Sequence, residues 1–338
     1  MAAKQKKGRR VGAGGIILGL LLALVLGGGV VAGAWWWGGN QPVPEDLREG
    51  RSVTSVDLDL YEPGETVTGE APVPAEAPDV ETASGSVSAG VTASDGYTYA
   101  EIIAEEDGLI VARLQGKRYK GFVAVVSDPM RLQVATCPYF GDGAYGRTVN
   151  QMADDCGAVL AINGGGFKDD GGNGLGGTPT GNVVADGVMR WAGGGSTVGM
   201  DYDGKLHVGE FSGNDCRDMG LYWAVAYGPT LIVDGSIRSG LDNSQAEPRT
   251  AVGQREDGSV VLVNIQGRQA SALGVTCRQL AYIMSALGCV NAGNLDGGAS
   301  SDMYYRGEFL NIANTSGGPR PLPTAVMVMP AGNEEAEG

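Results

Sequence analysis

Residues 294–301 combine the side chains most suited to chemistry in this sequence. One carboxylate stands beside a glycine pair and two hydroxyls, in the order Asn294, Leu295, Asp296, Gly297, Gly298, Ala299, Ser300 and Ser301. Asp296 is therefore the predicted catalytic carboxylate, although an Asp that only stabilises a turn is the simpler alternative. Ser300 is not expected to be a nucleophile, because its surroundings do not form the G-x-S-x-G elbow.

A second polar segment ends in three glycines. Asn163 precedes Gly164, Gly165 and Gly166 at the end of an apolar run. Consecutive backbone N–H groups in such a bend can converge on an anion, and an amide side chain can donate and accept hydrogen bonds. Taken alone, the segment also fits an ordinary glycine-rich turn.

An arginine opens another apolar run. Arg249 offers a planar fork suited to phosphate or carboxylate. Glu247 is its surface ion-pair partner in one interpretation and a second catalytic carboxylate in another. Asn182 precedes an Asp-Gly hairpin turn and is a weaker candidate for facing the same site.

Three other features favour less specific interpretations. The G-x-G-x-x-G at 141–146 lacks the doubly wound context that a dinucleotide site needs. The acidic stretch 169–173 has oxygen ligands for a structural calcium ion but not the EF-hand spacing. His207 is the only histidine, so a His-based triad or metal site is not expected.

The elements that position these residues alternate between helix and strand. The patterns predict helices at 148–156 and 276–287, each followed by a strand and then by polar and glycine residues. The second helix is expected to have Thr276 as its N-cap, Gly288 just after its end, and an apolar stripe made of Leu280, Ile283, Met284 and Leu287. Polar residues at strand ends bind ligands in many α/β sheets. If the two strands are neighbours, Cys156 and Cys289 are disulfide candidates, with two unpaired thiols as the alternative. We expect a mixed α/β (α+β) fold: one glycine-rich domain with a strand-rich mixed sheet and few helices.

The charge distribution divides the chain into parts. Residues 1–10 hold five basic residues and no acids, while the whole chain has a net charge of −15. The acidic remainder excludes nucleic acid as a partner. The uncharged run 11–37 is long enough to span a membrane and ends in three tryptophans. A cleaved signal peptide is the alternative.

These features predict a topology. Residues 1–10 are expected to be a cytoplasmic tip, 11–37 a transmembrane helix, 38–96 a Pro/Glu/Ala/Ser-rich linker, 97–331 the catalytic domain and 332–338 a disordered acidic tail. The domain is then extracellular, and its five cysteines fit an oxidising compartment.

Four segments, in this order, resemble the phosphodiester glycosidase family. They are 161–167, 181–187, 249–253 and 294–301. The resemblance spans roughly 122 to 329 and implies hydrolysis of a sugar-1-phosphodiester without a cofactor. Gln254 and the segment 266–268 depart from the family pattern.

The resemblance suggests a role for each candidate residue. Phosphate is expected to bind Arg249 and the amides of 164–166, and Asp296 is expected to be the base or the oxocarbenium stabiliser, with Glu247 in reserve. Sugar and phosphate contacts are expected from Asn163, Asn182, Asn294, Gly297, Gly298, Ser300 and Ser301. The expected substrate is a glycan phosphodiester in a cell-wall polymer or exopolysaccharide. Two alternatives are a non-catalytic glycan-binding domain and a phosphodiesterase that attacks phosphorus.

Overall fold

The structure is a computed structural model that describes residues 40–42, 90–116, 119–169, 174–269, 272–313 and 317–332. The predicted cytoplasmic tip, nearly all of the predicted membrane span and linker, and most of the acidic tail lie outside these residues. None of the helices in the described residues is long and apolar enough to cross a bilayer. Strand β1 (Asn40–Pro42) comes first in the sequence, and the main body of described residues begins at Gly90.

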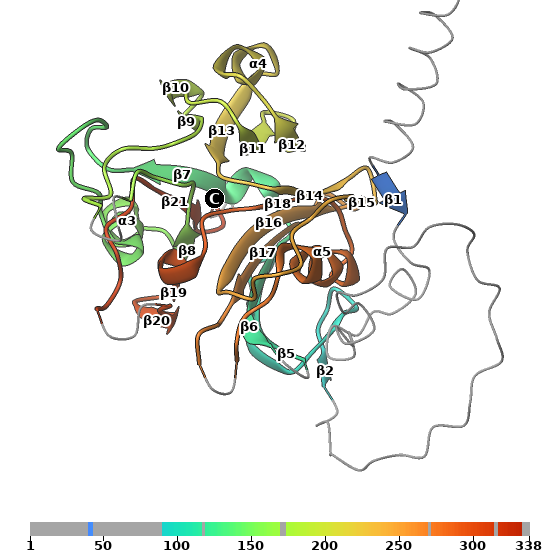
Figure 1. Cartoon of the computed structure of the whole chain (residues 1–338). Helices are drawn as coiled ribbons and strands as arrows, with labels where there is room; N and C mark the ends of the chain where they lie inside the picture. The colour runs from blue at the N-terminus through green and yellow to red at the C-terminus, as the bar shows by residue number, and fades with distance from the viewer. Residues whose placement is uncertain are drawn as a thin grey trace, which may run out of the picture. The chain divides into compact units, whose positions relative to one another are not determined.

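The described residues of the domain form antiparallel sheets and three α-helices (Figure 1). The order of strands in the first sheet is β15 (Ser236–Arg238), β14 (Thr230–Val233), β18 (Cys289–Asn294), β16 (Arg249–Arg255), β17 (Val260–Ile265), β6 (Lys120–Val126), β5 (Leu109–Gln115) and β4 (Glu101–Glu106). Neighbouring strands in this order pair antiparallel. The strand-rich α+β class is therefore confirmed, whereas the expected mixed sheet is replaced by antiparallel ones.

Two smaller sheets complete the strand framework. The second has the order β10 (Val188–Trp191), β9 (Val183–Ala185), β13 (Leu221–Ala226), β11 (Ser196–Asp201) and β12 (Leu206–Glu210). The third has the order β20 (Glu308–Asn311), β19 (Met303–Tyr305), β8 (Leu160–Asn163), β21 (Thr324–Val328) and β7 (Leu132–Thr136). Strands β2 (Val91–Thr92) and β3 (Thr98–Tyr99) form a hairpin, and β2 falls within the range predicted as linker.

The first sheet is buried on both faces because its residues alternate between two cores. In β17, Val261 and Val263 pack in the cluster that contains helix α5 (Cys277–Ala286). Val260 and Leu262 of the same strand pack in a second cluster with residues of the other two sheets. Because both faces are covered, the first four residues of β17, 260–263, are all apolar and do not alternate with polar ones.

Helix α5 has the capping and packing that its sequence predicts. The Thr276 hydroxyl accepts from the Gln279 N–H and completes a capping box. Leu280 and Ile283 belong to the predicted apolar stripe and are fully buried in the cluster that α5 forms with strands of the first sheet. Gly288 follows the helix with φ of +84°, a conformation that favours glycine.

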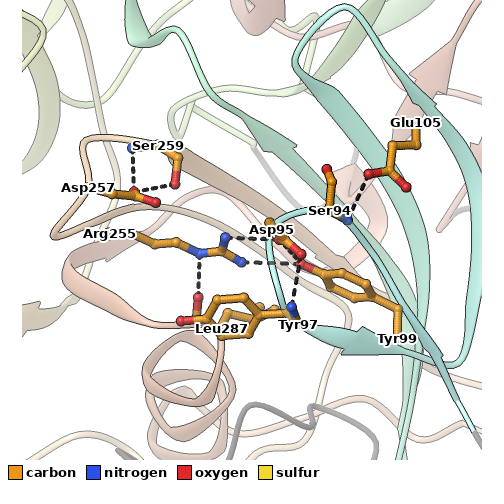
Figure 2. Close-up of polar contacts among 9 residues, drawn as sticks. All are labelled: Ser94, Asp95, Tyr97, Tyr99, Glu105, Arg255, Asp257, Ser259 and Leu287. Atoms are coloured by element: carbon orange, nitrogen blue, oxygen red, sulfur yellow. Dashed lines mark hydrogen bonds and ion pairs between the residues drawn. The ribbon is translucent and has the colours of Figure 1, made fainter.

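A buried arginine attaches the first hairpin to the end of β16 (Figure 2). The Arg255 guanidinium donates to Asp95 at 2.9 Å and to the Tyr99 hydroxyl at 3.2 Å, and its Nε donates to the Leu287 carbonyl. The ring of Tyr97 lies 3.9 Å from the guanidinium carbon. Residues 90–99 are thereby part of the folded domain.

The two remaining helices are short. Helix α3 (Val149–Cys156) packs against the third sheet, and α4 (Gly213–Asp218) packs against β13 of the second. Thr148 is the N-cap residue of α3, where its N–H donates to the Gln151 side chain at 3.1 Å, and Gly157 ends that helix with φ of +69°.

Candidate active site

Strands β16 and β18 bring the predicted arginine and the predicted acid together. Their antiparallel ladder ends at the pair formed by Ala251 and Asn294, which stand two residues after Arg249 and two residues before Asp296. The connection continues past the ladder, because the Leu295 N–H donates to the Thr250 carbonyl at 2.8 Å. The separation of the two side chains is therefore set by strand pairing.

Both side chains line one cavity of about 360 Å³. Arg249 and Asp296 thus share a pocket, as predicted from the sequence. The lining residues come from loops that follow or precede strands of all three sheets, and they are Phe167, Asp169, Tyr227, Glu247, Arg249, Arg268, Asp296, Gly297, Gly298, Ala299, Ser300 and Arg320.

Arg249 is oriented by main-chain carbonyl groups. Its Nε donates to the Val275 carbonyl at 3.2 Å, and its Nη2 donates to the Gln245 carbonyl at 3.1 Å. These bonds fix the plane of the guanidinium and leave Nη1 for a ligand. Glu247, the neighbour suggested as its partner, instead pairs with Arg268 at 3.5 Å.

A third arginine lies in another wall of the cavity. Arg320 pairs with Asp169 at 2.8 Å, and its guanidinium carbon lies 5.2 Å from the centre of the Phe167 ring. The Arg320 side chain is 16% exposed and the Asp169 side chain is 29% exposed. The cavity is therefore lined by three arginines and three carboxylates, which are Arg249, Arg268, Arg320, Asp169, Glu247 and Asp296.

The Gly297–Gly298 segment forms part of the cavity floor, and side chains there would clash. A Cβ on Gly298 would lie 3.1 Å from Nη2 of Arg268 and 3.5 Å from Oε2 of Glu247, and the residue has φ of +58°. A Cβ on Gly297 would lie 3.0 Å from the Pro248 carbonyl oxygen. The absence of both side chains keeps the space beside the arginines open.

Asp296 lies at the base of the cavity and is largely buried. Burial raises the pKa of its carboxyl to about 6. A hydrogen bond from Ser300, the Gly297 N–H at 2.9 Å and the charge of Arg320 each lower this pKa, while the charge of Asp169 raises it. A carboxylate with such a pKa is ionised at neutral pH and still able to accept a proton.

Three predicted sugar-binding residues lie beneath the cavity instead of in it. The Asn163 amide donates to the Asp296 carbonyl at 2.6 Å and accepts from the Thr250 hydroxyl at 2.7 Å. The Asn294 amide donates to the Gly228 carbonyl, and the Ser301 hydroxyl is fully buried. The structure therefore does not place Asn163, Asn294 and Ser301 in the lining of the cavity, because these side chains are enclosed by protein.

The triple-glycine bend also has a different role from the predicted one. The N–H groups of Gly164, Gly165 and Gly166 donate to the Thr324 carbonyl, the Thr324 hydroxyl and the Ala226 carbonyl. The predicted anion site is corrected, because these donors are already bound within the fold. The glycines are required for close packing, since a Cβ on Gly165 would lie 2.7 Å from the Ala226 oxygen.

Asn182 lies at the start of β9 and does not line the cavity. Its amide donates to the Thr197 hydroxyl at 3.1 Å and to the Phe211 carbonyl at 2.8 Å, and its oxygen accepts from the Gly194 N–H. The weak prediction that it faces the site is wrong, because its hydrogen bonds hold the second sheet and the loop before α4 together.

The predicted disulfide is not formed. Cys156 is exposed at the end of α3 and Cys289 is buried in β18, and both are free thiols. The prediction required neighbouring strands, but β8 belongs to the third sheet and β18 to the first. The similar sequence patterns of the two segments therefore do not mean that they are adjacent.

Several residues of the cavity were missed from the sequence. Arg268 lies in the segment 266–268, which was noted only as a departure, and its φ of +57° turns the chain at the end of β17. Asp169 was considered only as a calcium ligand and is an ion-pair partner here. Residues 170–173 of that acidic stretch lie outside the described residues, and among the described ones no group of three His, Cys, Asp or Glu side chains could hold a metal ion.

These features define a strand-rich domain with an arginine-lined cavity and a buried carboxylate at its base. The chain belongs to the phosphodiester glycosidase family, whose profile matches residues 156–329, more than half of its length.

Two curated relatives show the extent of the similarity. N-acetylglucosamine-1-phosphodiester alpha-N-acetylglucosaminidase of Mus musculus is 27% identical over 223 residues, covering 58% of this chain and 42% of the relative. The SPbeta prophage-derived uncharacterized protein YomE of Bacillus subtilis is 30% identical over 191 residues, covering 52% and 28%. The chain thus spans less than half the length of either relative.

Solved structures share the fold. The catalytic domain of the zebrafish N-acetylglucosamine-1-phosphodiester alpha-N-acetylglucosaminidase, auto-inhibited by its pro-peptide, superposes with a TM-score of 0.54 at 22% identity, covering 72% of this chain and 87% of that one. A hypothetical protein from Synechocystis has a TM-score of 0.52 at 15% identity, covering 67% and 63%. At these identities the likeness concerns the fold.

Proposed function

We propose that this chain is a hydrolase that cleaves the bond between a sugar and a phosphodiester. The observation that carries the proposal is that Arg249 and Asp296 line a single cavity. An arginine can bind the phosphate and an ionised carboxylate can act at the sugar, so one pocket accommodates both halves of the substrate. Family membership supports the same reaction.

In the proposed reaction, water attacks the anomeric carbon and the bond from that carbon to the phosphate oxygen breaks. Asp296 either accepts the proton of the water or stabilises the oxocarbenium charge. The phosphate leaves with the bonding electrons, and Arg249 and Arg268 stabilise its charge. Because a phosphodiester is already a good leaving group, its departure needs little help from a general acid. Glu247 is the residue that we assign to that role if an acid is required.

The proposed cellular setting follows from the N-terminal sequence. Residues 11–37 would anchor the chain in the membrane, with 1–10 in the cytoplasm and the domain outside. A polymer of the cell wall or an exopolysaccharide is then the proposed substrate. Protease added to intact cells should digest the domain, whereas a protected domain would contradict this topology.

The decisive test is hydrolysis of sugar-1-phosphodiesters by the full-length chain in detergent, performed in ¹⁸O-labelled water. Label in the released sugar supports attack at carbon, and label in the phosphate contradicts it in favour of a phosphodiesterase. Asp296→Asn should lower the rate at least about 100-fold, because the mutant lacks the carboxylate. Tight glycan binding without turnover by the wild-type chain would instead indicate a binding domain.

A further inference from the structure

A chain of buried hydrogen bonds leads to the start of the Asp296 loop. The Asn264 amide donates to the Thr250 hydroxyl at 3.2 Å, and that hydroxyl donates to the Asn163 amide oxygen at 2.7 Å. The Asn163 amide then donates to the main-chain carbonyl of Asp296 at 2.6 Å. Each of the three side chains is fully buried.

The same chain also reaches the end of the loop. The Asn311 amide donates to the Asn264 amide oxygen at 2.6 Å and to the main-chain carbonyl of Ser301 at 2.9 Å. Asn311 lies at the end of β20 in the third sheet, whereas Asn264 lies in β17 of the first. The chain therefore links two sheets as well as the two ends of the loop.

The direction of every bond in the chain is fixed. The Thr250 hydroxyl has one proton and donates it to Asn163, so it must accept from Asn264. The donors therefore run in one direction from Asn311 to the Asp296 carbonyl, an arrangement in which neighbouring bonds strengthen one another. A flipped amide at any position would place two donors or two acceptors face to face.

The loop itself has little local structure to hold it. Between Asp296 and Ser301 it contains the glycine pair and a single 3-10 turn at Gly298–Ser300. Glycine gives the backbone more conformational freedom than any other residue. A carboxylate on such a loop needs support from outside the loop to keep one orientation.

We propose that Thr250, Asn264 and Asn311 are positioning residues, which hold the Asp296–Ser301 loop at both ends and so keep the Asp296 carboxylate aligned with the substrate. None of the three lines the cavity. The catalytic part of this inference rests on the proposed function, whereas the support of the loop does not. Loss of one of these side chains leaves its hydrogen-bond partners buried and unpaired. The effect is therefore transmitted along the whole hydrogen-bond network.

The test is Thr250→Val, which keeps the shape of the side chain and removes the hydroxyl. We expect the kcat for a sugar-1-phosphodiester to fall about 10- to 100-fold while KM changes by less than about threefold, because the carboxylate is misaligned and phosphate binding by Arg249 is retained. Thr250→Ser should restore the hydroxyl and most of the activity. Hydrogen exchange of the Gly297–Ser301 amides should be at least about tenfold faster in the Val variant.

Thr197→Val is the matched control. Thr197 is also fully buried in a strand and in an amide network, because its hydroxyl accepts from Asn182 and donates to the Gly195 carbonyl. It belongs to the second sheet and does not line the cavity. This variant should lose stability without a change in kcat or in the exchange of the loop.

Other outcomes separate this inference from the proposed function. Wild-type loop exchange in both Thr250→Val and Asn311→Ala, the second variant in case the first does not fold, would overturn the positioning role. An equal fall of kcat in Thr197→Val would overturn it too, since the effect would then be general destabilisation. If the wild-type protein hydrolyses no sugar-1-phosphodiester, the proposed function is overturned. The hydrogen-exchange measurement still decides whether the hydrogen-bond network supports the Asp296–Ser301 loop.

Discussion

Arg249, the first residue of β16, and Asp296, two residues after the end of the paired strand β18, line the same cavity. Their approach depends on the register of β16 and β18, which is fixed on both faces by buried side chains. The Arg249 side chain is further oriented by two main-chain carbonyls, and the main-chain carbonyl of Asp296 accepts a hydrogen bond from the Asn163 amide of β8. The positions of Arg249 and Asp296 in the cavity therefore depend on strands of the domain core.

The pH dependence of hydrolysis should report the ionisation of Asp296. Burial raises the pKa of this carboxyl to about 6, so the reactive carboxylate is lost as the pH falls through that value. We expect kcat/KM to decline below about pH 6 and to be level above it. An acid limb near pH 4, the range of an unperturbed aspartate, would contradict the assignment.

Removing the charge of Arg320 and removing the charge of Asp169 should shift the acid limb of the kcat/KM profile in opposite directions. The charge of Arg320 lowers the pKa of Asp296, so Arg320→Gln should shift the limb to higher pH. The charge of Asp169 raises that pKa, so Asp169→Asn should shift it to lower pH. The pH profiles of kcat/KM for the two variants check this, and shifts of the same sign would show that both changes merely disturb the cavity.

Gly298→Ala should impair activity more than its backbone strain explains. The new Cβ would lie 3.1 Å from Arg268 and 3.5 Å from Glu247 at a residue with φ of +58°. Gly235→Ala is the control, because Gly235 has φ of +73° and nothing within 4 Å of the Cβ position. Both variants should lose about 1 kcal/mol of stability. Only Gly298→Ala should lower kcat/KM, by about tenfold or more, and equal kinetics in the two variants would contradict the role of the glycine floor.

Asp302 should make the domain less stable as the pH rises. This carboxyl is fully buried, and burial raises its pKa to about 7. The folded protein thus holds a proton that the unfolded chain releases near pH 4, so the stabilisation is present below that pH and is lost as the pH rises to about 7.

Asp302→Asn mimics the protonated acid and should remove this slope. Urea unfolding at pH 5 and pH 8 measures it, and we expect the wild-type protein to lose about 2–4 kcal/mol more than the variant between these values. Asp142→Asn, at a side chain that is 91% exposed, should behave like the wild type. A slope unchanged by Asp302→Asn would assign the effect to other groups.

The sequence predicts local structure well where the pattern is confined to one element. Helix α5 has the expected cap, apolar stripe and terminal glycine, because these depend on residues within about one turn of each other. The meeting of Arg249 and Asp296 could also be predicted, although through the resemblance of whole segments rather than from their spacing.

Contacts between distant segments could not be predicted in the same way. The amides of residues 164–166 bind Thr324 and Ala226, so whether the glycine bend is an anion site or a packing contact depends on residues far along the chain. The failed disulfide has the same origin, since only the sheet topology separates β8 from β18. No sequence motif around Arg320 indicates a site. This residue lies in the segment before β21 and reaches the cavity only through the fold.

The floor of the cavity and its rim come from different kinds of structure. Asp296 and Arg249 extend two paired strands of the core, whereas Arg268, Tyr227 and Arg320 stand on connections outside the strands. Connections tolerate insertion and replacement far better than buried strands do. Related domains can therefore acquire new substrates by changing these connections while they keep Arg249 and Asp296. Mutant libraries confined to these connections are the most direct way to alter substrate selectivity.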